Sequence, residues 1–547
     1  MRDRATVNMP IWPIDTPVLY NATAVRIVVF HYHLLPGGVT EVIVNSVLAV
    51  AKHRTDIESV VFVCGRAENA ENVAARVRSG GVPVDLVVWD AIDYTSANEP
   101  TADARARAVR VQSILVDRFG EPGTLWWVHN FHVGKNPAFT LALCRIAEAA
   151  DSPLMLLHIH DFPECARFEN LAYLHRIAGN SVYPSSPFVR YVVINSRDRD
   201  VLVAAGMPAD TVHLLVNPLP DNRTIRTGSR DHLIDALSRF ASENQQKFDP
   251  DKPLLLYPIR AIRRKNVLEM ALLAKLAGDW NLITTLPGSS AAERPYSDLV
   301  DHAYETGAAT GVFGIGRREA EVGTSFEELT SQADLIVSSS VQEGFGMLFV
   351  NALAWQVPLF ARHLPVLGGI QSVFEGYPAS FYGCVRVPFF APGLSDYRAY
   401  LRMRYRERLD EIGSGLGEQA RTRVEVQLEA SLGGSEIDFA YLPVETQFAI
   451  LQNAADEGFA ATLRDLNQDT VGGLTALPGL DCPDMSLRIS SVFGYSAYAD
   501  GFNRAVQSFG RPEGPATAMD GLQARLISEF ADLDNLRLLF APFGKHG

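Results

Sequence analysis

The sequence has few cysteines and lacks any paired ones. Five cysteines are scattered along 547 residues, and no two of them form a C-x-x-C pair. An odd number at these spacings fits neither a disulfide framework nor a zinc cluster, so a reducing compartment is the simpler interpretation. Long apolar runs are also missing. No stretch approaches the ~20 residues of a membrane helix, and residues 1–15 hold no signal-peptide pattern. We therefore expect a cytoplasmic protein without a transmembrane segment.

Positively charged residues are also fewer than negatively charged ones. The chain has 49 Lys and Arg against 63 Asp and Glu, which gives a net charge of −14. A surface of that sign repels phosphate polymers, so no nucleic-acid partner is expected, although a local basic site is compatible with it. With 47% hydrophobic and 20% charged residues the composition is that of a globular protein. At roughly 150 residues per domain, the length allows three to four domains, or two large ones with extensions.

Short β-branched runs alternate with helical patterns in the first part of the chain. The run VRIVVF (25–30) is typical of a buried parallel strand, and the turn PGGV (36–39) and a helical stretch (40–53) follow it. Further strands are expected at 58–65, 84–90, 124–130, 153–161, 191–196 and 213–218. This alternation predicts right-handed β-α-β units and a doubly wound sheet. Trp126 and Trp127 are expected in its core.

A polar, turn-rich segment (220–232) separates this series from a second one. The second series has expected strands at 254–259, 281–288, 311–316, 334–340 and 357–362. The predicted class is α/β, with two Rossmann-like doubly wound domains that face a cleft, where ligands bind beyond the carboxyl ends of the strands. We place an N-terminal domain at 1–219, a second domain at 220–485 and a helical C-terminal extension at 486–547. Charged helix is expected at 400–432, and segment 486–508 is the candidate for a return to the first domain.

The most informative stretch is DLIVSSSVQEGFGMLFVNALAW (334–355), which has the pattern strand, loop, helix. Its loop holds Glu343, Gly344, Phe345 and Gly346. The glycines allow a ligand to approach the backbone closely, and the helix that follows directs free N–H groups and a positive dipole end toward an anion. An ordinary β-α turn would have the same glycines, so both interpretations stay open on this stretch alone.

A second strand-loop-helix stretch, YPIRAIRRKNVLEM (257–270), is unusually basic for this acidic chain. Arg260, Arg263, Arg264 and Lys265 crowd the loop before the helix. The helix dipole disfavours cations at that end, so they require an anion, and a diphosphate held between guanidinium and ammonium groups is the natural candidate. A solvated surface loop is the alternative.

The order strand–R-x-x-x-x-K–helix followed by strand–S-x-x-E-G-F-G–helix resembles retaining glycosyltransferases of GT-B fold, of the family-four (group 1) type. The resemblance covers residues 25–370. It includes PGGV (36–39) in the first loop, HDF (160–162) after a central strand and NP (217–218) at the domain junction. The E-G-F-G segment with its upstream Arg and Lys is specific, whereas PGGV or HD alone would be weak.

This resemblance implies a hexosyltransferase that uses a nucleotide-diphosphate sugar, bound by the second domain, and no cofactor. Arg260 and Lys265 match the pair that neutralises the donor diphosphate, and Glu343 matches an acid that contacts the donor sugar. His160 matches a histidine that lies over that sugar. The implied catalytic residues are His160, Glu343, Arg260 and Lys265. The implied donor-binding residues are Gly38, Arg260, Lys265, Glu343, Gly344, Phe345, Gly346 and Asn351.

The sequence departs from the family pattern at two positions. The second acid of the motif, which binds the nucleotide ribose, is replaced by Asn351, which can hydrogen-bond without charge assistance. The glycine that usually precedes the matched arginine is Ile259. The implied chemistry is a front-face transfer with retained configuration, without a carboxylate pair of the hydrolase kind. No D-x-D loop follows a strand, because DLD (532–534) falls in a helical pattern, so no catalytic metal is predicted.

Several histidines lie at first-domain strand ends and support a rival from another class. His31 and His33 share one face of a strand, as do His158 and His160, so each pair could chelate a metal in a metal-dependent hydrolase. The alternative is that they line a sugar-binding cleft or are hydrogen-bonded in place. The hydrolase does not explain the cationic loop.

FHVGKNP (131–137) places a Gly-Lys pair at the start of a helix. It is not a P-loop, because His129 stands where the upstream glycine should be. Two interpretations stay open: Lys135 and Asn136 face the acceptor side of the cleft, or they form a helix cap with an exposed lysine.

Other properties stay open at this level. Asn351 keeps alive a third interpretation, a non-catalytic relative that binds nucleotide sugars. The acceptor, a sugar or another small molecule, cannot be read from the first-domain loops, and neither can the sugar or base of the donor. Residues 66–82 and 400–547 exceed a minimal two-domain enzyme, and two roles stay open for them: shaping the acceptor site or forming a homo-oligomer contact.

Overall fold

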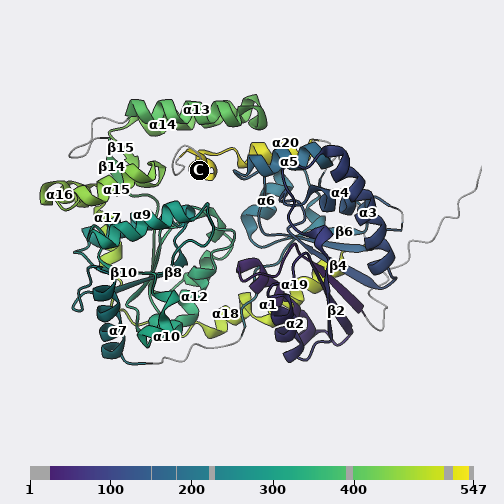
Figure 1. The fold of residues 1–547 in the computed structure, drawn as a ribbon, viewed down its shortest axis with the longest axis horizontal. Helices are drawn as coiled ribbons and strands as arrows, with labels where there is room; N and C mark the ends of the chain where they lie inside the picture. Colours follow the sequence, from purple (N-terminus) through teal and green to yellow (C-terminus); the bar gives the residue numbers. More distant parts are fainter. Residues whose placement is uncertain are drawn as a thin grey trace, which may run out of the picture.

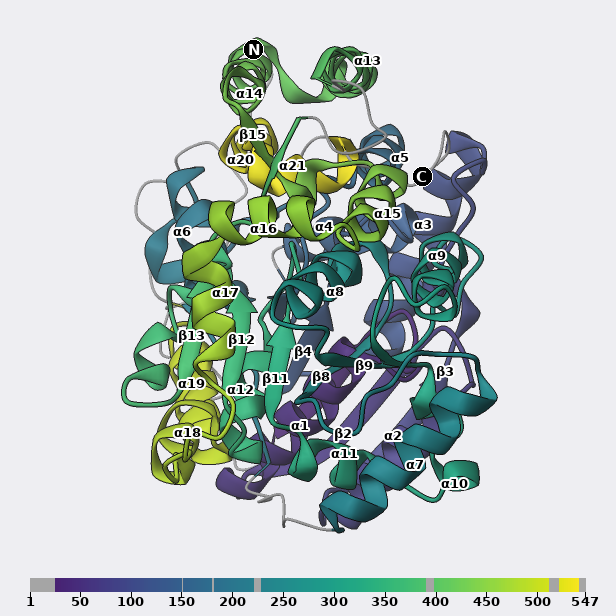
Figure 2. The same cartoon turned by 90° about the vertical axis from the view of Figure 1, so that its left-hand side faces the viewer.

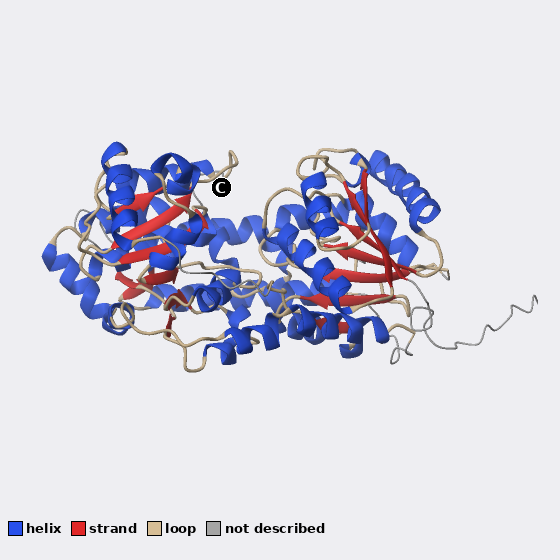
Figure 3. Ribbon diagram, turned by 90° about the horizontal axis from the view of Figure 1, so that it is seen from below, coloured by secondary structure: helices blue, strands red, loops and turns tan. Residues whose placement is uncertain are grey.

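The computed structural model describes residues 25–149, 151–179, 182–220, 228–389, 398–510 and 521–540. These residues form two lobes that lie side by side (Figure 1). In each lobe a parallel β-sheet runs through the centre and helices cover it on both sides (Figure 3). Among the described residues, no helix combines the length and the apolar character that a membrane crossing needs.

The first lobe is built on a seven-stranded parallel sheet with the order β3-β2-β1-β4-β5-β6-β7. The strands are β1 (Val25–Phe30), β2 (Ile57–Cys64), β3 (Val84–Val88), β4 (Thr124–His129), β5 (Leu154–Ile159), β6 (Val189–Val193) and β7 (Val212–Leu214). The strand order reverses between β1 and β4, so the loops that leave their carboxyl ends diverge there and open a crevice. The predicted strands are therefore confirmed, with ends shifted by a few residues.

Helices on both faces bury the apolar side chains of this sheet. They are α1 (Gly38–His53), α2 (Ala70–Ser79), α3 (Thr101–Phe119), α4 (Pro137–Ala147), α5 (Phe168–Ala178) and α6 (Ser196–Ala204). Trp126 and Trp127 alternate along β4, so their rings enter the hydrophobic clusters on opposite faces of the sheet, and both are fully buried. The prediction that they belong to the core is confirmed.

The second lobe repeats the plan with a six-stranded parallel sheet, in the order β10-β9-β8-β11-β12-β13. Its strands are β8 (Leu254–Arg260), β9 (Asn281–Leu286), β10 (Gly311–Phe313), β11 (Leu335–Ser338), β12 (Leu359–Arg362) and β13 (Ala379–Tyr382). Its helices are α7 (Arg230–Glu243), α8 (Val267–Leu276), α9 (Arg294–Glu305), α10 (Glu319–Val322), α11 (Phe326–Gln332) and α12 (Met347–Trp355). Two such domains and a helical C-terminal region are the predicted GT-B architecture.

The chain beyond β13 is mostly helical. A short antiparallel pair, β14 (Arg386–Pro388) with β15 (Glu436–Asp438), frames a hairpin of two long helices, α13 (Arg398–Leu416) and α14 (Glu418–Gly433). Figure 2 shows this hairpin at the top of the molecule, beyond the end of the second sheet. It corresponds to the charged helices predicted at 400–432. The next helices are α15 (Val444–Asn453), α16 (Glu457–Leu466) and α17 (Gln468–Thr475).

The last helices connect the two lobes. They are α18 (Ser486–Phe493), α19 (Tyr495–Gln507), α20 (Leu522–Phe530) and α21 (Leu533–Phe540). Phe493 of α18 is buried in the second-lobe core, whereas Phe502 of α19 is buried against α1 in the first lobe. Phe530 of α20 likewise joins the first-lobe core. The segment 486–508 thus crosses from one lobe to the other (Figure 1). The domain limits drawn above stay a prediction.

A buried ion cluster ties the second sheet to the segment that follows it. The guanidinium of Arg362, at the end of β12, donates to both carboxylate oxygens of Glu269 at 2.7 and 3.0 Å and to both oxygens of Asp438 at 2.8 and 2.9 Å. Glu269 also accepts from the hydroxyl of Tyr382 and the amide of Asn266, both at 2.8 Å. Arg362 and Glu269 are almost completely buried, so this cluster is closed to solvent.

Candidate active site between the two domains

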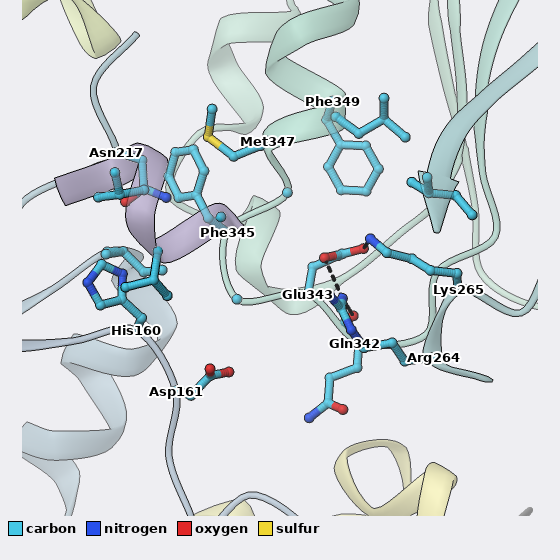
Figure 4. A pocket seen from close by; sticks show the side chains of 18 of the residues that line it. His160, Asp161, Asn217, Arg264, Lys265, Gln342, Glu343, Phe345, Met347 and Phe349 are labelled. Atoms are coloured by element: carbon cyan, nitrogen blue, oxygen red, sulfur yellow. Dashed lines mark hydrogen bonds and ion pairs between the residues drawn. The ribbon is translucent and has the colours of Figure 1, made fainter. Parts of the chain in front are cut away.

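A cavity of about 550 Å³ lies between the two lobes, and both contribute to its lining. The first lobe supplies residues that follow β1, β5 and β6, and the second supplies residues that follow β8 and β11. All of these are carboxyl ends of parallel strands, where α/β sheets bind ligands. Figure 4 shows Arg264, Lys265 and Glu343 together in this cavity, across from His160 and Asp161.

The E-G-F-G loop lies against the first lobe. A Cβ atom at Gly344 would lie 3.1 Å from the backbone oxygen of His160, a contact that requires the first-lobe loop to move. Gly346 precedes α12 with a left-handed φ of 88°, and a Cβ there would lie 2.6 Å from the ring of Phe349. Both glycines are therefore needed for the shape of the loop, which agrees with a backbone that approaches a ligand.

The side chains of the cationic loop point in different directions. Lys265 Nζ forms an ion pair with Glu343, and Arg264 Nη1 donates to the Glu343 carboxylate at 2.8 Å and to the Gln342 carbonyl at 2.9 Å. Both basic residues line the cavity. They form the positive wall of the site.

The two other cations of the loop do not line this cavity. Arg263 donates to the carbonyl oxygens of Ala440 and Leu442, at 3.2 and 3.5 Å, and so fastens the segment before α15 to the sheet. Arg260, which the sequence matched to the diphosphate pair, is 44% exposed and lies 3.5 Å from the Glu293 carboxylate. In this structure Arg264, not Arg260, is the arginine beside Lys265 and Glu343.

Glu343 is held in its ionised form. Burial alone would raise the pKa of its carboxyl, but the charges of Lys265 and Arg264 outweigh burial and, with a 2.6 Å hydrogen bond from Ser340 Oγ, hold the pKa at about 2. Burial lowers the pKa of Lys265, and Glu343 opposes that effect. Two cations facing one carboxylate leave one net positive charge at the cavity wall, which favours an anionic ligand.

Opposite this wall lies a cluster of buried histidines. His129 on β4 stands beside His158 on β5 in the parallel register. His129 Nδ1 lies 2.9 Å from His160 Nε2, and the rings of His158 and His160 are 4.3 Å apart. Burial lowers the pKa of all three, that of His158 to about 3, and the neighbouring imidazoles lower the pKa of His129 and His160 further. All three rings are therefore neutral at pH 7.

The geometry of this cluster bears on the metal interpretation. One nitrogen from each of His129, His158 and His160 lies within 4.8 Å of the others, which is compatible with a metal site. However, the Trp127 indole N–H donates to His158 Nδ1 at 3.3 Å. An indole nitrogen only donates, so Nδ1 is the acceptor and Nε2 of the neutral ring carries the proton. Neither nitrogen of His158 is then available to a metal. Within the described part of the chain, Nε2 of His158 and Nε2 of His129 are buried without a hydrogen-bond partner.

The structure brings most of the predicted site residues together. The cavity is lined by Gly38, His160, Lys265, Glu343, Gly344, Phe345, Gly346 and Asn351. Arg260 is not in its lining. Asn351 lies on α12, one helical turn beyond Met347 at its start. Of the other predicted histidine pair, His31 adjoins the three-histidine cluster, because its Nδ1 lies 3.3 Å from the His129 carbonyl, whereas His33 bonds Tyr94 at 3.1 Å.

Sequence reasoning missed several residues that line the cavity or contact its lining. Arg264 stood in the cationic loop without an assigned role, and Ser340 and Asp161 were quoted only within longer motifs. Asn195 was not singled out at all, yet its Nδ2 donates to the Gly344 carbonyl at 2.7 Å and connects the first lobe to the E-G-F-G loop. A polar residue close to the end of a strand is the signal that could have indicated Asn195, because strand ends form the cleft.

Comparisons with known proteins give the following likenesses. No family model matches the chain. The chain is 26% identical over 525 residues to mannosylglucosyl-3-phosphoglycerate synthase of Petrotoga mobilis. The alignment covers 94% of this chain and 99% of that protein. Among solved structures, Anabaena HepE in complex with UDP and glucose has a TM-score of 0.45 at 13% identity, covering 88% of this chain and 100% of that one. Sucrose-phosphate synthase from Thermosynechococcus elongatus has a TM-score of 0.45 at 14% identity, covering 82% and 99%. Because both TM-scores are below 0.5, the two-domain architecture is inferred from the strand order of the two sheets and not from these structures.

Proposed function

We propose that this protein is a glycosyltransferase that moves a sugar from a nucleotide-diphosphate donor to an acceptor bound by the first domain, with retention of anomeric configuration. The observation that carries the proposal is the convergence of Arg264, Lys265 and Glu343 with the E-G-F-G backbone in one interdomain cavity. The wall has a net positive charge and suits a diphosphate, and the adjacent buried carboxylate suits sugar hydroxyls.

In the proposed reaction, the acceptor hydroxyl attacks the anomeric carbon from the face on which the diphosphate leaves. The bond between that carbon and the diphosphate oxygen breaks, and the departing oxygen takes the acceptor proton. Lys265 and Arg264 neutralise the negative charge that grows on the diphosphate, which lowers the barrier. Because two fixed cations supply this charge, the proposal needs no metal ion.

Glu343 and His160 are proposed to position the donor sugar. The Glu343 carboxylate stays ionised at pH 7 and can accept hydrogen bonds from sugar hydroxyls. His160 is a neutral imidazole whose Nε2 is paired with His129, so its ring orientation is fixed. Asn351 is proposed to bind the ribose through neutral hydrogen bonds.

The Petrotoga relative supports a transferase. Its name describes the synthesis of a glycosylated phosphoglycerate, and the match extends over nearly the full length of both proteins. We therefore propose a related sugar-transfer reaction for this chain.

Thermal shift against nucleoside diphosphates and their sugars tests the donor site. A ligand that binds only the folded protein, present at 100 times its dissociation constant, adds about 2.7 kcal/mol of stability. We expect a shift with at least one nucleoside diphosphate, and we expect R264A/K265A to lose it. Lys247 is the control, because it is half-exposed and pairs with Asp279 at 3.6 Å in the second lobe. Lys247→Ala should keep the shift.

Product analysis separates the remaining functions. Transfer of sugar to an acceptor, with the α- or β-configuration of the donor kept in the product, supports the proposal. Binding without turnover of any nucleotide sugar would instead identify a non-catalytic binder. An unchanged shift in R264A/K265A would overturn the donor site.

A further inference from the structure

A second group of cations lies at the same edge of the first lobe, next to the cavity. Loops that follow four strands of the first sheet bring together Arg66 after β2, Tyr94 after β3, Lys135 after β4 and Arg167 after β5. Of these, Arg167 also lines the interdomain cavity. The group is therefore continuous with the proposed donor site, on its first-domain side.

Tyr94 is the centre of this group. The guanidinium carbon of Arg66 lies 5.3 Å from the centroid of the Tyr94 ring, and Lys135 Nζ lies 5.4 Å from it. The Tyr94 hydroxyl is 3.1 Å from His33 Nε2. An aromatic face attracts cations, so the ring holds two positive side chains in place and leaves their hydrogen-bond donors available.

The backbone that carries Lys135 is fixed to the neighbouring loop. The Lys135 carbonyl accepts from the Thr95 N–H at 2.9 Å. Asn136 Nδ2 donates to the carbonyls of Ala91 and Asp93 at 2.9 and 2.7 Å, while its Oδ1 caps α4. Gly134 has a left-handed φ of 73°, and a Cβ there would lie 2.3 Å from the Asn170 carbonyl oxygen. Lys135 thus stands on a tightly packed loop, as expected of a built site.

The charges in this group are only partly balanced. Arg66 Nε pairs with both carboxylate oxygens of Asp93, at 2.7 and 2.8 Å, and Arg167 pairs with Asp161 at 3.0 Å. Among the described residues, no oxygen accepts a hydrogen bond from Lys135 Nζ. Lys135 is half-buried, and burial and the charge of Arg167 both lower its pKa. A partly desolvated ammonium without an anionic partner is costly. Lys135 is therefore the cation of this group that lacks an acidic partner among the described residues, whereas the charge of Glu68 also acts on Arg66.

We propose that Lys135, with Arg66 and Arg167, binds an anionic group of the acceptor, so that the acceptor is a small hydroxy compound bearing a carboxylate or a phosphate. This inference rests on the proposed transferase function. Asn136 caps α4, as one of the two interpretations of the Gly-Lys segment expected, and the proposal assigns Lys135 to the acceptor side.

Binding of defined anions tests the proposal. Isothermal titration would use 3-phosphoglycerate, glycerol 3-phosphate, glycerate and glycerol, each with the full-length protein, alone and in the presence of a saturating nucleoside diphosphate that fills the donor site. We expect the anions but not glycerol to bind in both conditions. We expect Lys135→Met to weaken anion binding by at least about tenfold, the loss of one charged hydrogen bond. The ranking of the phosphate and the carboxylate probes identifies the group that is bound.

Three comparisons make the result decisive. Lys135→Arg should keep most of the anion affinity, and Lys247→Met should keep all of it. Nucleoside diphosphate binding should be the same in Lys135→Met as in the unaltered protein, which separates this site from the donor site. Anion binding that disappears when the diphosphate is saturating, or that survives in both Lys135→Met and R66M, would overturn the acceptor site. Absence of anion binding would do so too. Failure of diphosphate binding alone would instead overturn the donor site.

Discussion

Two ion clusters of the second domain differ in their position: the cluster around Glu343 lines the interdomain cavity, and the cluster around Arg362 does not. Around Arg362, one guanidinium donates to two carboxylates and to the Gly383 carbonyl, and Tyr382 and Asn266 donate to Glu269. Around Glu343, two cations face one carboxylate, and the group lines a cavity. The first cluster has its hydrogen bonds made within the fold.

The difference indicates how a structural role of a buried charge can be distinguished from a ligand-binding role. A cluster whose donors and acceptors are all used holds elements of the fold together, and a ligand has nothing to bind there. A cluster that presents its charge at a cavity wall gains from a ligand of the opposite charge. By this reasoning, altering the Arg362 cluster changes stability alone, and altering the Glu343 cluster changes binding as well as stability.

The largest effect is expected from Arg362→Leu. It leaves the buried carboxylates of Glu269 and Asp438 without their cation, which costs roughly 3–5 kcal/mol of the free energy of unfolding. Urea denaturation would measure the loss. Arg386 supplies the control, because it is 61% exposed and lies 3.5 Å from Glu436, so Arg386→Leu should cost less than about 1 kcal/mol. Equal costs for the two variants would break the comparison.

Lys265→Met tests the open cluster. Removing one cation from the site of the leaving diphosphate should lower kcat by about 10²–10³-fold, as removal of a transition-state donor does. Steady-state kinetics with the donor identified by thermal shift would measure it, and Lys247→Met should leave kcat unchanged. A loss of stability without a loss of turnover would place Lys265 in the same class as Arg362.

The loss of folding stability at low pH tests whether Glu343 is ion-paired. Its pKa is about 2 in the folded protein against 4.5 when unperturbed, so its ionised form stabilises the fold above pH 4.5 and the contribution is lost as the pH falls toward 2. This contribution is about 3 kcal/mol. Chemical denaturation between pH 2 and pH 6 should show the unaltered protein losing more stability on acidification than Glu343→Gln. Parallel curves would contradict an ion-paired Glu343.

The smallest effect is expected from Arg260→Ala, and Arg264→Ala is its matched partner. Arg260 is exposed and outside the cavity lining, so its loss should change diphosphate affinity by no more than about twofold, whereas loss of Arg264 should weaken it by about tenfold or more. Titration of the two variants with the same nucleoside diphosphate decides between them. A larger effect at Arg260 would mean that the bound protein adopts a different loop arrangement, as the family resemblance implies.

Sequence patterns predicted much of the fold because each buried strand is a continuous apolar run. VRIVVF and LLLYPI could be recognised locally, and the parallel topology follows from their alternation with helices. The E-G-F-G loop was also recognisable from the local sequence, because its backbone conformation requires the glycines. The hairpin of α13 and α14 was predicted only as charged helix, because its position depends on distant contacts such as the one from Gln427 to Asp532.

The site was only partly predictable, and Arg260 illustrates why. Spacing identifies a cluster of four cations but not their directions. The turn that contains Arg263 to Lys265 ends at Asn266 with a left-handed φ of 51°, and this turn directs Arg264 and Lys265 into the cavity and Arg263 away from it. The histidine cluster was incomplete for a similar reason: His129 joins His158 and His160 only through the register of β4 against β5.

The sequence by itself determined the class of the fold, the two-domain plan, the acidic surface and the kinds of residue at the strand ends, because these depend on composition and on patterns within about ten residues of chain. The tertiary structure decided which of those residues share a cavity, which arginine faces Glu343, and which lysine has no anion beside it. Charge balance is a property of neighbours in space, and residues far apart in the chain become neighbours only when the sheets form and the lobes meet.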